Sequence, residues 1–307
     1  AMPRGLCERS MTTVVIVQAR VGSARLPAKV LKRVGKQAIL THVLARAKRI
    51  PGIDRVALTT TDDPADDVLV NLCRGAGVSW TRGQIPLVGQ PGRRDVLAGY
   101  VAAAAACKAD VIVRVTSDCP LLDPAVAGDV LAALRGGVAY SSNVHPPTFF
   151  DGCDIEVFTR AALLEAHANA GPNEREHVTT WMHQHLPIMN IRAPQGLDYS
   201  ALKLSVDDSR DLERVRRVWG ALTDHEEFGW RDVVAAYQRA FPSVAEIRAR
   251  AVYGGVHLRV TGPLCVAFVA GAASVAALDI DCPYSCRAEE SAWRLGRDDA
   301  REQGYRV

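Results

Sequence analysis

The sequence predicts an α/β protein whose mostly parallel β-sheet carries helices on both faces. Short apolar runs alternate with longer stretches of helical periodicity from residue 13 onward, and this alternation is typical of right-handed βαβ units. The first run, VVIV at residues 14–17, is β-branched throughout, as expected of a strand buried on both faces of a parallel sheet. With 307 residues, of which 48% are hydrophobic, the chain is long enough to bury a full core.

The expected elements follow one another in chain order. Apolar runs predict strands near residues 13–18, 55–60, 78–81 and 110–115, and helical periodicity predicts helices near 37–49, 64–76 and 95–107. Beyond residue 140 the pattern predicts a strand at 154–158, helices at 159–169 and 177–185, and strands at 187–193 and 202–206. Charged amphipathic helices are expected over residues 208–250. The sheet is therefore expected to be mixed in this later region.

Charge and composition limit the partners of the chain. The formal net charge is only +3, and it does not come from one long basic run, so we expect no nucleic-acid partner. Residues 264–278 are nearly all apolar, but this run is too short for a comfortable membrane span, and we expect no membrane association. The local basic clusters suit a small polyanionic ligand better.

The cysteines and the N-terminus favour a cytoplasmic location. No two cysteines form a CxxC pair, and Cys282 and Cys286 lack histidines at zinc-finger spacing. Several cysteines lie in apolar contexts typical of buried free thiols. Residues 1–10 lack the apolar core of a secretory signal; they are expected to be an N-terminal extension, or residues from cloning, ahead of a natural start at Met11. The eight cysteines are Cys7, Cys73, Cys107, Cys119, Cys153, Cys265, Cys282 and Cys286.

A small and cationic loop follows the first expected strand. Gly22 and Ser23 allow backbone N–H groups to approach an anion, and Arg20, Arg25 and Lys29 add three positive charges. Backbone donors, arginine forks and a lysine point charge together bind phosphate oxygens well. The loop contains neither a GxGxxG nor a Walker motif. We interpret it as a triphosphate loop; the alternative is an ordinary β–α turn that happens to be basic.

The loop and three later segments resemble one family of enzymes. The segment QARVGSARLPAKVL is similar to the N-terminal signature of the cytidylyltransferases of the CMP-Kdo and CMP-sialate synthetase superfamily, and closest to its spore-coat-polysaccharide branch. The segments VRVTSDCPLLDP, FFDGCDIEVF with EREHVT after it, and LSVDDSRDLERV match in the same order. The resemblance implies a Rossmann-like nucleotide-diphospho-sugar transferase (GT-A-like) fold with a small dimerisation subregion, and a homodimer.

The resemblance also implies a division of the chain and a reaction. A cytidylyltransferase domain is expected over residues 11–250, after the extension at 1–10 and before a C-terminal extension at 251–307 whose role nothing in the sequence indicates. The implied reaction transfers CMP from CTP to a sugar, sugar acid or related polyol, with release of pyrophosphate, as in the biosynthesis of nucleotide sugars and polysaccharides. The residues assigned to CTP are Ala19, Arg20, Gly22, Ser23, Arg25, Lys29, Asp95 and Ser117. For Asp95, the alternative is an N-cap of the helix at 96–107.

Two carboxylates are expected to hold Mg²⁺, and with Arg25 and Lys29 they form the expected catalytic set. Asp118 follows an expected strand, where a carboxylate is well placed to hold Mg²⁺ against phosphate oxygens. The family's metal acids fall on Asp118 and Asp207. The alternatives are helix caps: Asp118 for the helix starting near residue 124, and Asp208 for the helix at 209–222. Asp208 is expected to be a cap.

A second set of residues lies where the family lines the acceptor pocket: Asn143, Asp154, Glu156, Arg175, Glu176 and His177. Asp154 and Glu156 are expected on one face of a strand, and Arg175 would grip an anionic group, whereas a structural role is equally expected for His177. Residues 84–94 and 145–150 depart from the family pattern and leave the identity of the acceptor open.

Two other functions remain as alternatives. One is a nucleotide-sugar-dependent glycosyltransferase, although Asp118 lacks the second aspartate of a DxD motif. The other is a non-catalytic nucleotide-binding or assembly module.

Overall fold

The computed structural model describes residues 11–87, 93–195, 197–241, 248–253 and 256–261. The chain divides into two compact units. The first consists of Ala1–Pro146 and Asp154–Ile191, and the second of Pro147–Cys153 and Arg192–Val307. The chain therefore leaves the first unit after Pro146, returns to it at Asp154, and leaves it again after Ile191.

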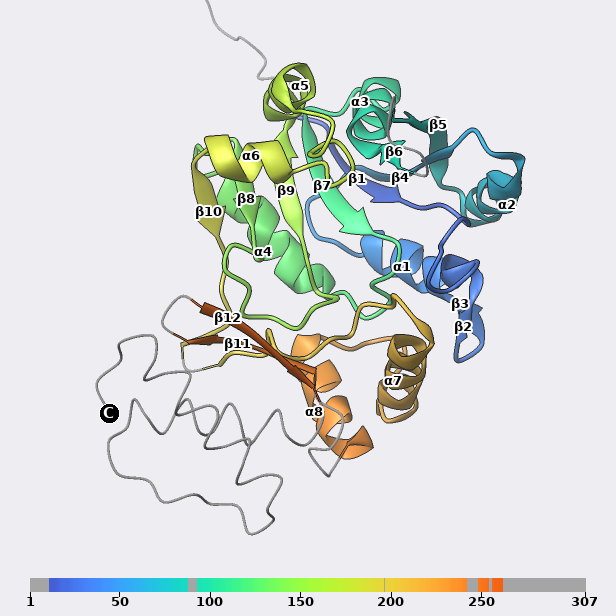
Figure 1. Cartoon of the computed structure of the whole chain (residues 1–307), viewed down its shortest axis with the longest axis vertical. Helices are drawn as coiled ribbons and strands as arrows, with labels where there is room; N and C mark the ends of the chain where they lie inside the picture. The colour runs from blue at the N-terminus through green and yellow to red at the C-terminus, as the bar shows by residue number, and fades with distance from the viewer. Residues whose placement is uncertain (1–10, 88–92, 196, 242–247, 254–255, 262–307) are drawn as a thin grey trace, which may run out of the picture. The chain divides into compact units, whose positions relative to one another are not determined.

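An eight-stranded sheet forms the centre of the first unit (Figure 1). Its strands run in the order β10 (Ile188–Asn190), β8 (Tyr140–Ser142), β9 (Glu156–Thr159), β7 (Val111–Thr116), β1 (Thr13–Gln18), β4 (Arg55–Thr61), β5 (Ser79–Pro86) and β6 (Arg94–Asp95). Strand β1 pairs in parallel with β4 and β7, β4 with β5, and β8 with β10. Strand β9 is antiparallel to both of its neighbours, and β6 is antiparallel to β5. The predicted mostly parallel sheet is confirmed.

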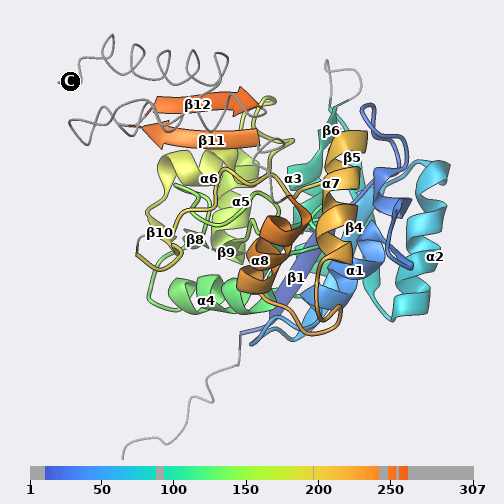
Figure 2. The same ribbon diagram turned by 90° about the horizontal axis from the view of Figure 1, so that it is seen from below.

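Helices cover both faces of this sheet, as Figures 1 and 2 show. Helix α3 (Val96–Ala106) packs on β1, β4 and β5 and against α5 (Arg160–Asn169), which in turn contacts α6 (Thr180–His185). Helix α4 (Pro124–Leu134) lies on the opposite face, against β8, β9 and β10. The two sides of β8 reflect this arrangement, because Tyr140 belongs to the core under α3 and α5, whereas the hydroxyl of Ser141 donates to the Val130 carbonyl of α4 over 2.8 Å.

Shorter elements complete the first unit. Helix α1 (Ile39–Ala47) packs against the 3₁₀ turn η1 (Lys29–Leu31) and β3 (Gln37–Ala38), which pairs with β2 (Arg33–Val34). Helix α2 (Asp67–Ala76) follows a second 3₁₀ turn, η2 (Pro64–Asp66), and ends at Gly77, whose φ of 63° is the left-handed conformation that glycine adopts without a steric penalty.

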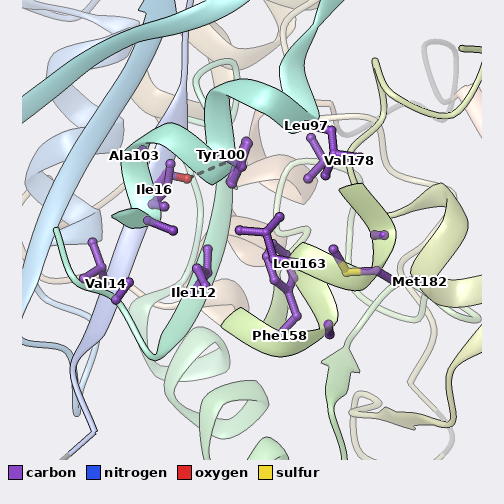
Figure 3. Close-up of a cluster of buried hydrophobic side chains, with 14 of the residues drawn as sticks. Val14, Ile16, Leu97, Tyr100, Ala103, Ile112, Phe158, Leu163, Val178 and Met182 are labelled. Atoms are coloured by element: carbon purple, nitrogen blue, oxygen red, sulfur yellow. Dashed lines mark hydrogen bonds between the residues drawn. The ribbon is translucent and has the colours of Figure 1, made fainter. Parts of the chain in front are cut away.

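A cluster of buried hydrophobic side chains joins strands β1 and β7 to helices α3, α5 and α6 (Figure 3). Strands β1 and β7 contribute Ile16 and Ile112, and helix α3 contributes Leu97 and Tyr100, all of them fully buried. The Tyr100 hydroxyl donates to the Ile16 carbonyl over 3.1 Å, and burial raises its pKa above the usual value of 10.0. This contact ties the middle of α3 to strand β1.

The described part of the second unit contains two amphipathic helices and a hairpin. Helix α7 (Ser209–Gly220) packs against α8 (Trp230–Ala240), and strands β11 (Arg248–Tyr253) and β12 (Val256–Thr261) pair antiparallel. The Trp230 ring meets those of Phe149 and Tyr199, with centroids 5.4 and 5.6 Å apart. Asp208 caps α7 in a capping box with Asp211, as the sequence predicts.

Several sequence predictions need correction. The strand predicted at 202–206 does not form; the segment contributes one isolated parallel bridge, between Lys203 and Asp151. The helix predicted from residue 177 begins at Thr180, and residues 248–250 belong to a strand instead of a helix. Strand β8 was not predicted, because three residues are too few to show a period. The apolar run at 264–278 lies outside the described residues.

The described cysteines agree with the expected free thiols: Cys73, Cys107, Cys119 and Cys153 are buried and outside any disulfide. Burial raises the pKa of Cys73 to about 11, so its thiol stays protonated at neutral pH. Over the same described part of the chain, no helix combines the length and the apolar character that crossing a bilayer requires.

Candidate active site

The expected phosphate loop and Asp118 meet at one edge of the sheet. Strands β1 and β7 are parallel neighbours with Gln18 opposite Thr116, so the segments that follow them start side by side. The Lys29 ammonium contacts the Asp118 carboxylate at 2.7 Å, and each side chain is about one-fifth exposed, at 17% and 22%. The structure thus places a lysine of the loop in direct contact with the predicted metal acid. Ligands of open α/β sheets bind at this carboxyl edge.

Backbone hydrogen bonds shape the loop between Gln18 and Lys29. The Ala19 N–H donates to the Thr59 carbonyl over 3.1 Å and so extends the β1–β4 pairing by one residue. The Val21 carbonyl accepts from Ser23 at 2.9 Å and from Ala28 at 3.2 Å, which folds the loop back on itself. Ala28 takes the left-handed conformation with φ of 54°, directly before η1 begins at Lys29.

Gly22 leaves room for a ligand at the outer side of this loop. A Cβ placed on Gly22 would have no atom within 4 Å, and its φ lies outside the left-handed range. Neither packing nor backbone conformation therefore requires glycine here. Close approach of a ligand to the backbone is a role that remains for it.

Asp95 caps helix α3 and also binds Arg175. Its carboxylate accepts from the Ala98 N–H over 2.8 Å and from Arg175 Nε over 2.7 Å. The N-cap reading of Asp95 is thus confirmed, while its contact with CTP stays a prediction. Ser117, which was assigned to CTP with it, is buried at the end of β7.

A reciprocal pair of ion pairs joins the segment before α3 to the segment after α5. Arg93 Nε lies 2.5 Å from Glu176, and Arg175 Nε lies 2.7 Å from Asp95, so each segment supplies one arginine and one acid. The Leu97 N–H also donates to the Arg175 carbonyl over 2.9 Å. Arg93 was not predicted from the sequence, because a pair 83 residues apart leaves no local signal.

Two predicted acceptor residues therefore lie beside the predicted nucleotide residues. Glu176 faces Arg20 of the loop at 3.9 Å as well as Arg93. Arg175 also bonds to His167, through the carbonyl at 3.0 Å and the ring Nδ1 at 2.8 Å. The Arg175 guanidinium is therefore held between Asp95 and His167. His177, two residues further on, is exposed.

Two other predicted acceptor residues form hydrogen bonds within the protein, next to strands β8 and β9. Asn143 is buried, accepts from the Ile155 N–H over 2.8 Å and returns its own N–H to the Ile155 carbonyl at 3.2 Å. Glu156 is buried between Arg114 and Tyr140 and bonds to both. Strand β9 begins at Glu156, so the alternation expected to place Asp154 on the same face does not extend to that residue.

The environment of Glu156 sets its charge. Burial alone would raise the pKa of this carboxyl, but Arg114 and hydrogen bonds from Tyr140 and Thr179 outweigh it and lower the pKa below its ordinary 4.5. His145 Nε2 lies 3.9 Å from the same carboxylate, and its ring stands 4.5 Å from that of His183. Burial lowers the pKa of His145, against the opposing effect of Glu156.

Asp207 lies in the second unit, in a cluster centred on Lys203. The Lys203 ammonium is 3.0 Å from Asp207, 3.4 Å from Asp151 and 3.9 Å from Asp211. Burial works to lower the pKa of Lys203, but the surrounding carboxylates outweigh it and raise its pKa above 10.5. Within the described residues, no group of three or more His, Cys, Asp or Glu side chains is arranged to hold a metal ion by itself.

Two residues of the DGCD motif, Asp151 and Gly152, pack against the segment that carries Lys203. Backbone bonds link Asp151 to Leu202 and Leu204, at 2.9 and 2.6 Å. A Cβ on Gly152 would lie 2.7 Å from the Leu204 carbonyl carbon, and its φ is 116°, so only glycine fits between these segments.

The capping alternative for Asp118 is wrong, because Asp123 caps α4 through the Ala125 N–H at 2.7 Å.

A family model described as "Cytidylyltransferase" matches residues 14–221. The chain belongs to the cytidylyltransferase family. The match includes the loop, Asp118, the DGCD and EREHVT segments and Asp207, and it confirms the resemblance and the expected nucleotidyltransferase activity. The glycosyltransferase and non-catalytic alternatives are not favoured by it.

The chain is also similar to individual proteins and to a solved structure. The chain is 32% identical over 208 residues to protein MJ1063 of Methanocaldococcus jannaschii, covering 66% of this chain and 81% of that protein. It is 25% identical to the spore coat polysaccharide biosynthesis protein SpsF of Bacillus subtilis over 234 residues, which cover 73% of this chain and 93% of SpsF. A cytidylyltransferase structure from Leptospira borgpetersenii superposes with a TM-score of 0.68 at 27% identity, covering 75% and 94% of the two chains.

Proposed function

We propose that this cytidylyltransferase transfers CMP from CTP to a hydroxyl group of a sugar, sugar acid or related polyol. The observation that carries the proposal is the contact of Lys29 with Asp118 at 2.7 Å, at the carboxyl edge where the loop and strand β7 end. A cation for phosphate and an acid for a metal ion are thereby held at one place. The similarity to a protein named for polysaccharide biosynthesis supports an acceptor of the carbohydrate class.

The chemistry needs positioning more than a covalent nucleophile. The acceptor oxygen attacks the α-phosphorus of CTP, its proton leaves to solvent or a base, and the bond to the β-phosphate oxygen breaks to release pyrophosphate. Arg20, Arg25 and Lys29, with backbone N–H groups around Gly22 and Ser23, would hold the triphosphate and neutralise its spreading charge. Because the Ala19 N–H is engaged in the sheet, only its carbonyl is left to accept from the cytosine amino group.

The donor chemistry of the two aspartates fits Mg²⁺. This ion is usually bound by one or two carboxylates together with substrate phosphates and water, instead of by a cage of protein ligands, and Asp118 is a partly exposed carboxylate at the phosphate edge. When bound, Mg²⁺ would neutralise phosphate charge and orient the leaving group. Lys29 would hold Asp118 in place until the nucleotide arrives. The proposed role of Asp207 as a second ligand rests on the resemblance and on its carboxylate.

On the acceptor side we assign six residues to the pocket: Asn143, Asp154, Glu156, Arg175, Glu176 and His177. Asn143, Glu156 and Arg175 would support this pocket through their protein partners, since their polar groups already bind Ile155, Arg114 and Asp95. We further propose, from the resemblance, that the enzyme works as a cytoplasmic homodimer and that residues 11–250 form its cytidylyltransferase domain.

Two measurements test the proposed function. With Mg²⁺ present, CTP should raise the melting temperature more than ATP, GTP or UTP, because a ligand that binds the native state stabilises it by mass action. Pyrophosphate release should then depend on both CTP and an acceptor from a panel of sugars, sugar acids and polyols. Equal stabilisation by all four nucleotides would contradict the base assignment, and no release with any acceptor would contradict the reaction.

A further inference from the structure

One buried carboxylate outside the predicted site touches the nucleotide loop. Asp66 is 2% exposed and lies at the junction of η2 and α2. Its Oδ1 accepts from the Val21 N–H over 2.7 Å, although 45 residues separate the two in sequence. As the residue before α2 it makes no capping bond to that helix, so its carboxylate serves the loop and strand β4 instead.

The other oxygen of Asp66 is tied to the end of β4. Its Oδ2 accepts from the Thr60 hydroxyl at 3.0 Å, from the Thr61 N–H at 3.3 Å and from the Thr61 hydroxyl. Both threonines are buried. The carboxylate is thus a rigid bridge with one end on the sheet and the other end on the loop.

Val21 is the residue on which the rest of the loop depends. Its carbonyl accepts from the N–H groups of Ser23 and Ala28 at 2.9 and 3.2 Å, so Val21 is held by Asp66 through its N–H and organises the loop through its carbonyl. Ala28 adopts a left-handed conformation, which a residue with a side chain keeps only where its surroundings fix it. Lys29, with its contact to Asp118, follows directly.

We propose that Asp66 is a positioning residue for the nucleotide: it holds the Val21 peptide so that the loop presents Ser23, Arg25 and Lys29 to the phosphates before CTP binds. The inference rests on the proposed function of the loop. It extends that function to a residue that touches no substrate, and it assigns part of the affinity for CTP to preorganisation of the loop.

The test compares three variants by hydrogen exchange and by steady-state kinetics. Asp66→Ala removes the bridge, whereas in Asp66→Asn one amide oxygen remains to accept from Val21, so this variant should show partial rescue. The control Asp63→Ala removes a nearby exposed aspartate that caps η2 through the Ala65 N–H at 2.9 Å and does not contact the loop. Amide hydrogen exchange of residues 21–28 is measured for all three variants without nucleotide. KM and kcat are measured with CTP and acceptor.

We expect Asp66→Ala to accelerate exchange in the loop and to raise the KM for CTP about tenfold, the factor that corresponds to one lost hydrogen bond to a charged group. The KM for the acceptor should stay unchanged, which a general loss of stability would not produce. Asp66→Asn should be intermediate, and Asp63→Ala should match the wild type. Unchanged loop exchange, or a KM for CTP no higher than that of Asp63→Ala, would overturn the inference.

Lys29→Ala separates failure of this inference from failure of the proposed site. If Lys29→Ala weakens CTP binding and Asp66→Ala does not, only the inference is wrong. If neither variant affects CTP, the loop is not the nucleotide site. Should Asp66→Ala fail to fold, Thr60→Val takes its place, since it removes the 3.0 Å hydroxyl bond to Asp66 and preserves the shape of the buried side chain; the same comparison with Asp63→Ala then decides.

Discussion

Arg175 and Asp95, 80 residues apart, form an ion pair of 2.7 Å that joins the EREHVT segment to the first turn of α3. The two side chains are 16% and 9% exposed, so little solvent screens the pair. Asp95 is predicted to contact CTP, and Arg175 is predicted to support the acceptor pocket. We therefore expect the pair to couple the two halves of the proposed reaction, which the sequence alone presents as separate.

Arg175→Ala should accordingly impair use of both substrates. In this variant Asp95 keeps its cap bond to Ala98 but loses its charged partner. We therefore expect the free energy of unfolding to fall by about 2 kcal/mol. We also expect a higher KM for CTP and for the acceptor. Chemical denaturation and calorimetry with CTP alone measure the two effects. Arg94→Ala is the control: Arg94 contacts the largely exposed Asp62 at 3.2 Å, a kind of pair that contributes little to stability. Wild-type affinity for CTP in Arg175→Ala would show that the halves are independent.

Lys29→Ala should raise the KM for CTP and lower kcat together. The ammonium would contact phosphate both in the bound ground state and as charge develops, so its loss removes stabilisation at both stages. We expect kcat/KM to fall on the order of 10- to 100-fold, as for one hydrogen bond to a charged group. Steady-state kinetics at saturating acceptor check this. The exposed Lys36 provides a matched variant, Lys36→Ala, which should behave as the wild type; a similar loss in both would indicate a general effect of charge.

Asp118→Asn and Asp207→Asn should each abolish most turnover and leave the protein folded. Each substitution removes a negative charge expected to face Mg²⁺ and keeps the shape of the side chain. Asp123→Asn provides the contrast, because Asp123 caps α4; asparagine is also a good cap, so both stability and rate should stay near the wild type. Rate against Mg²⁺ concentration, together with the melting temperature, separates the roles. Near-wild-type turnover at saturating Mg²⁺ would remove that aspartate from the metal site.

The stability of the fold should depend on pH through Glu156. Arg114 and the hydrogen bonds of Glu156 hold its pKa below 4.5 in the folded state despite its burial. A carboxyl with a lowered folded-state pKa stabilises the protein above its unfolded pKa, and this contribution is lost as the pH falls from about 4.5 through the folded-state value. The free energy of unfolding, measured by denaturation at pH 7 and at pH 4, should therefore decline less in Glu156→Gln than in the wild type. The variant should itself be less stable, because Arg114 stays buried without its partner. An equal decline in both proteins would exclude Glu156 as the source.

The core of the site was predictable from the sequence because parallel strands bring their carboxyl ends to one edge. The run at 14–17 and the run before Asp118 predict parallel strands of one sheet, so the residues that follow them are expected at the same carboxyl edge. The helix caps at Asp95 and Asp208 were predictable for a similar reason, since a cap bonds within its own first turn. Local patterns suffice where the interaction itself is local or follows from topology.

The partners of the remaining polar residues were decided by tertiary structure alone. TDDPADD contains four aspartates, and nothing in the segment indicates that Asp66 is the one that reaches Val21. KLSV alternates like a strand at 203–206, yet a strand needs a neighbour to pair with, and only Lys203 forms a bridge, to Asp151. The sequence by itself determined the fold class and the two segments, the loop at 18–29 and Asp118, that meet at the carboxyl edge. Packing decided which acceptor-side residues bind other protein groups, because a charged side chain buried by distant segments must find its partner there.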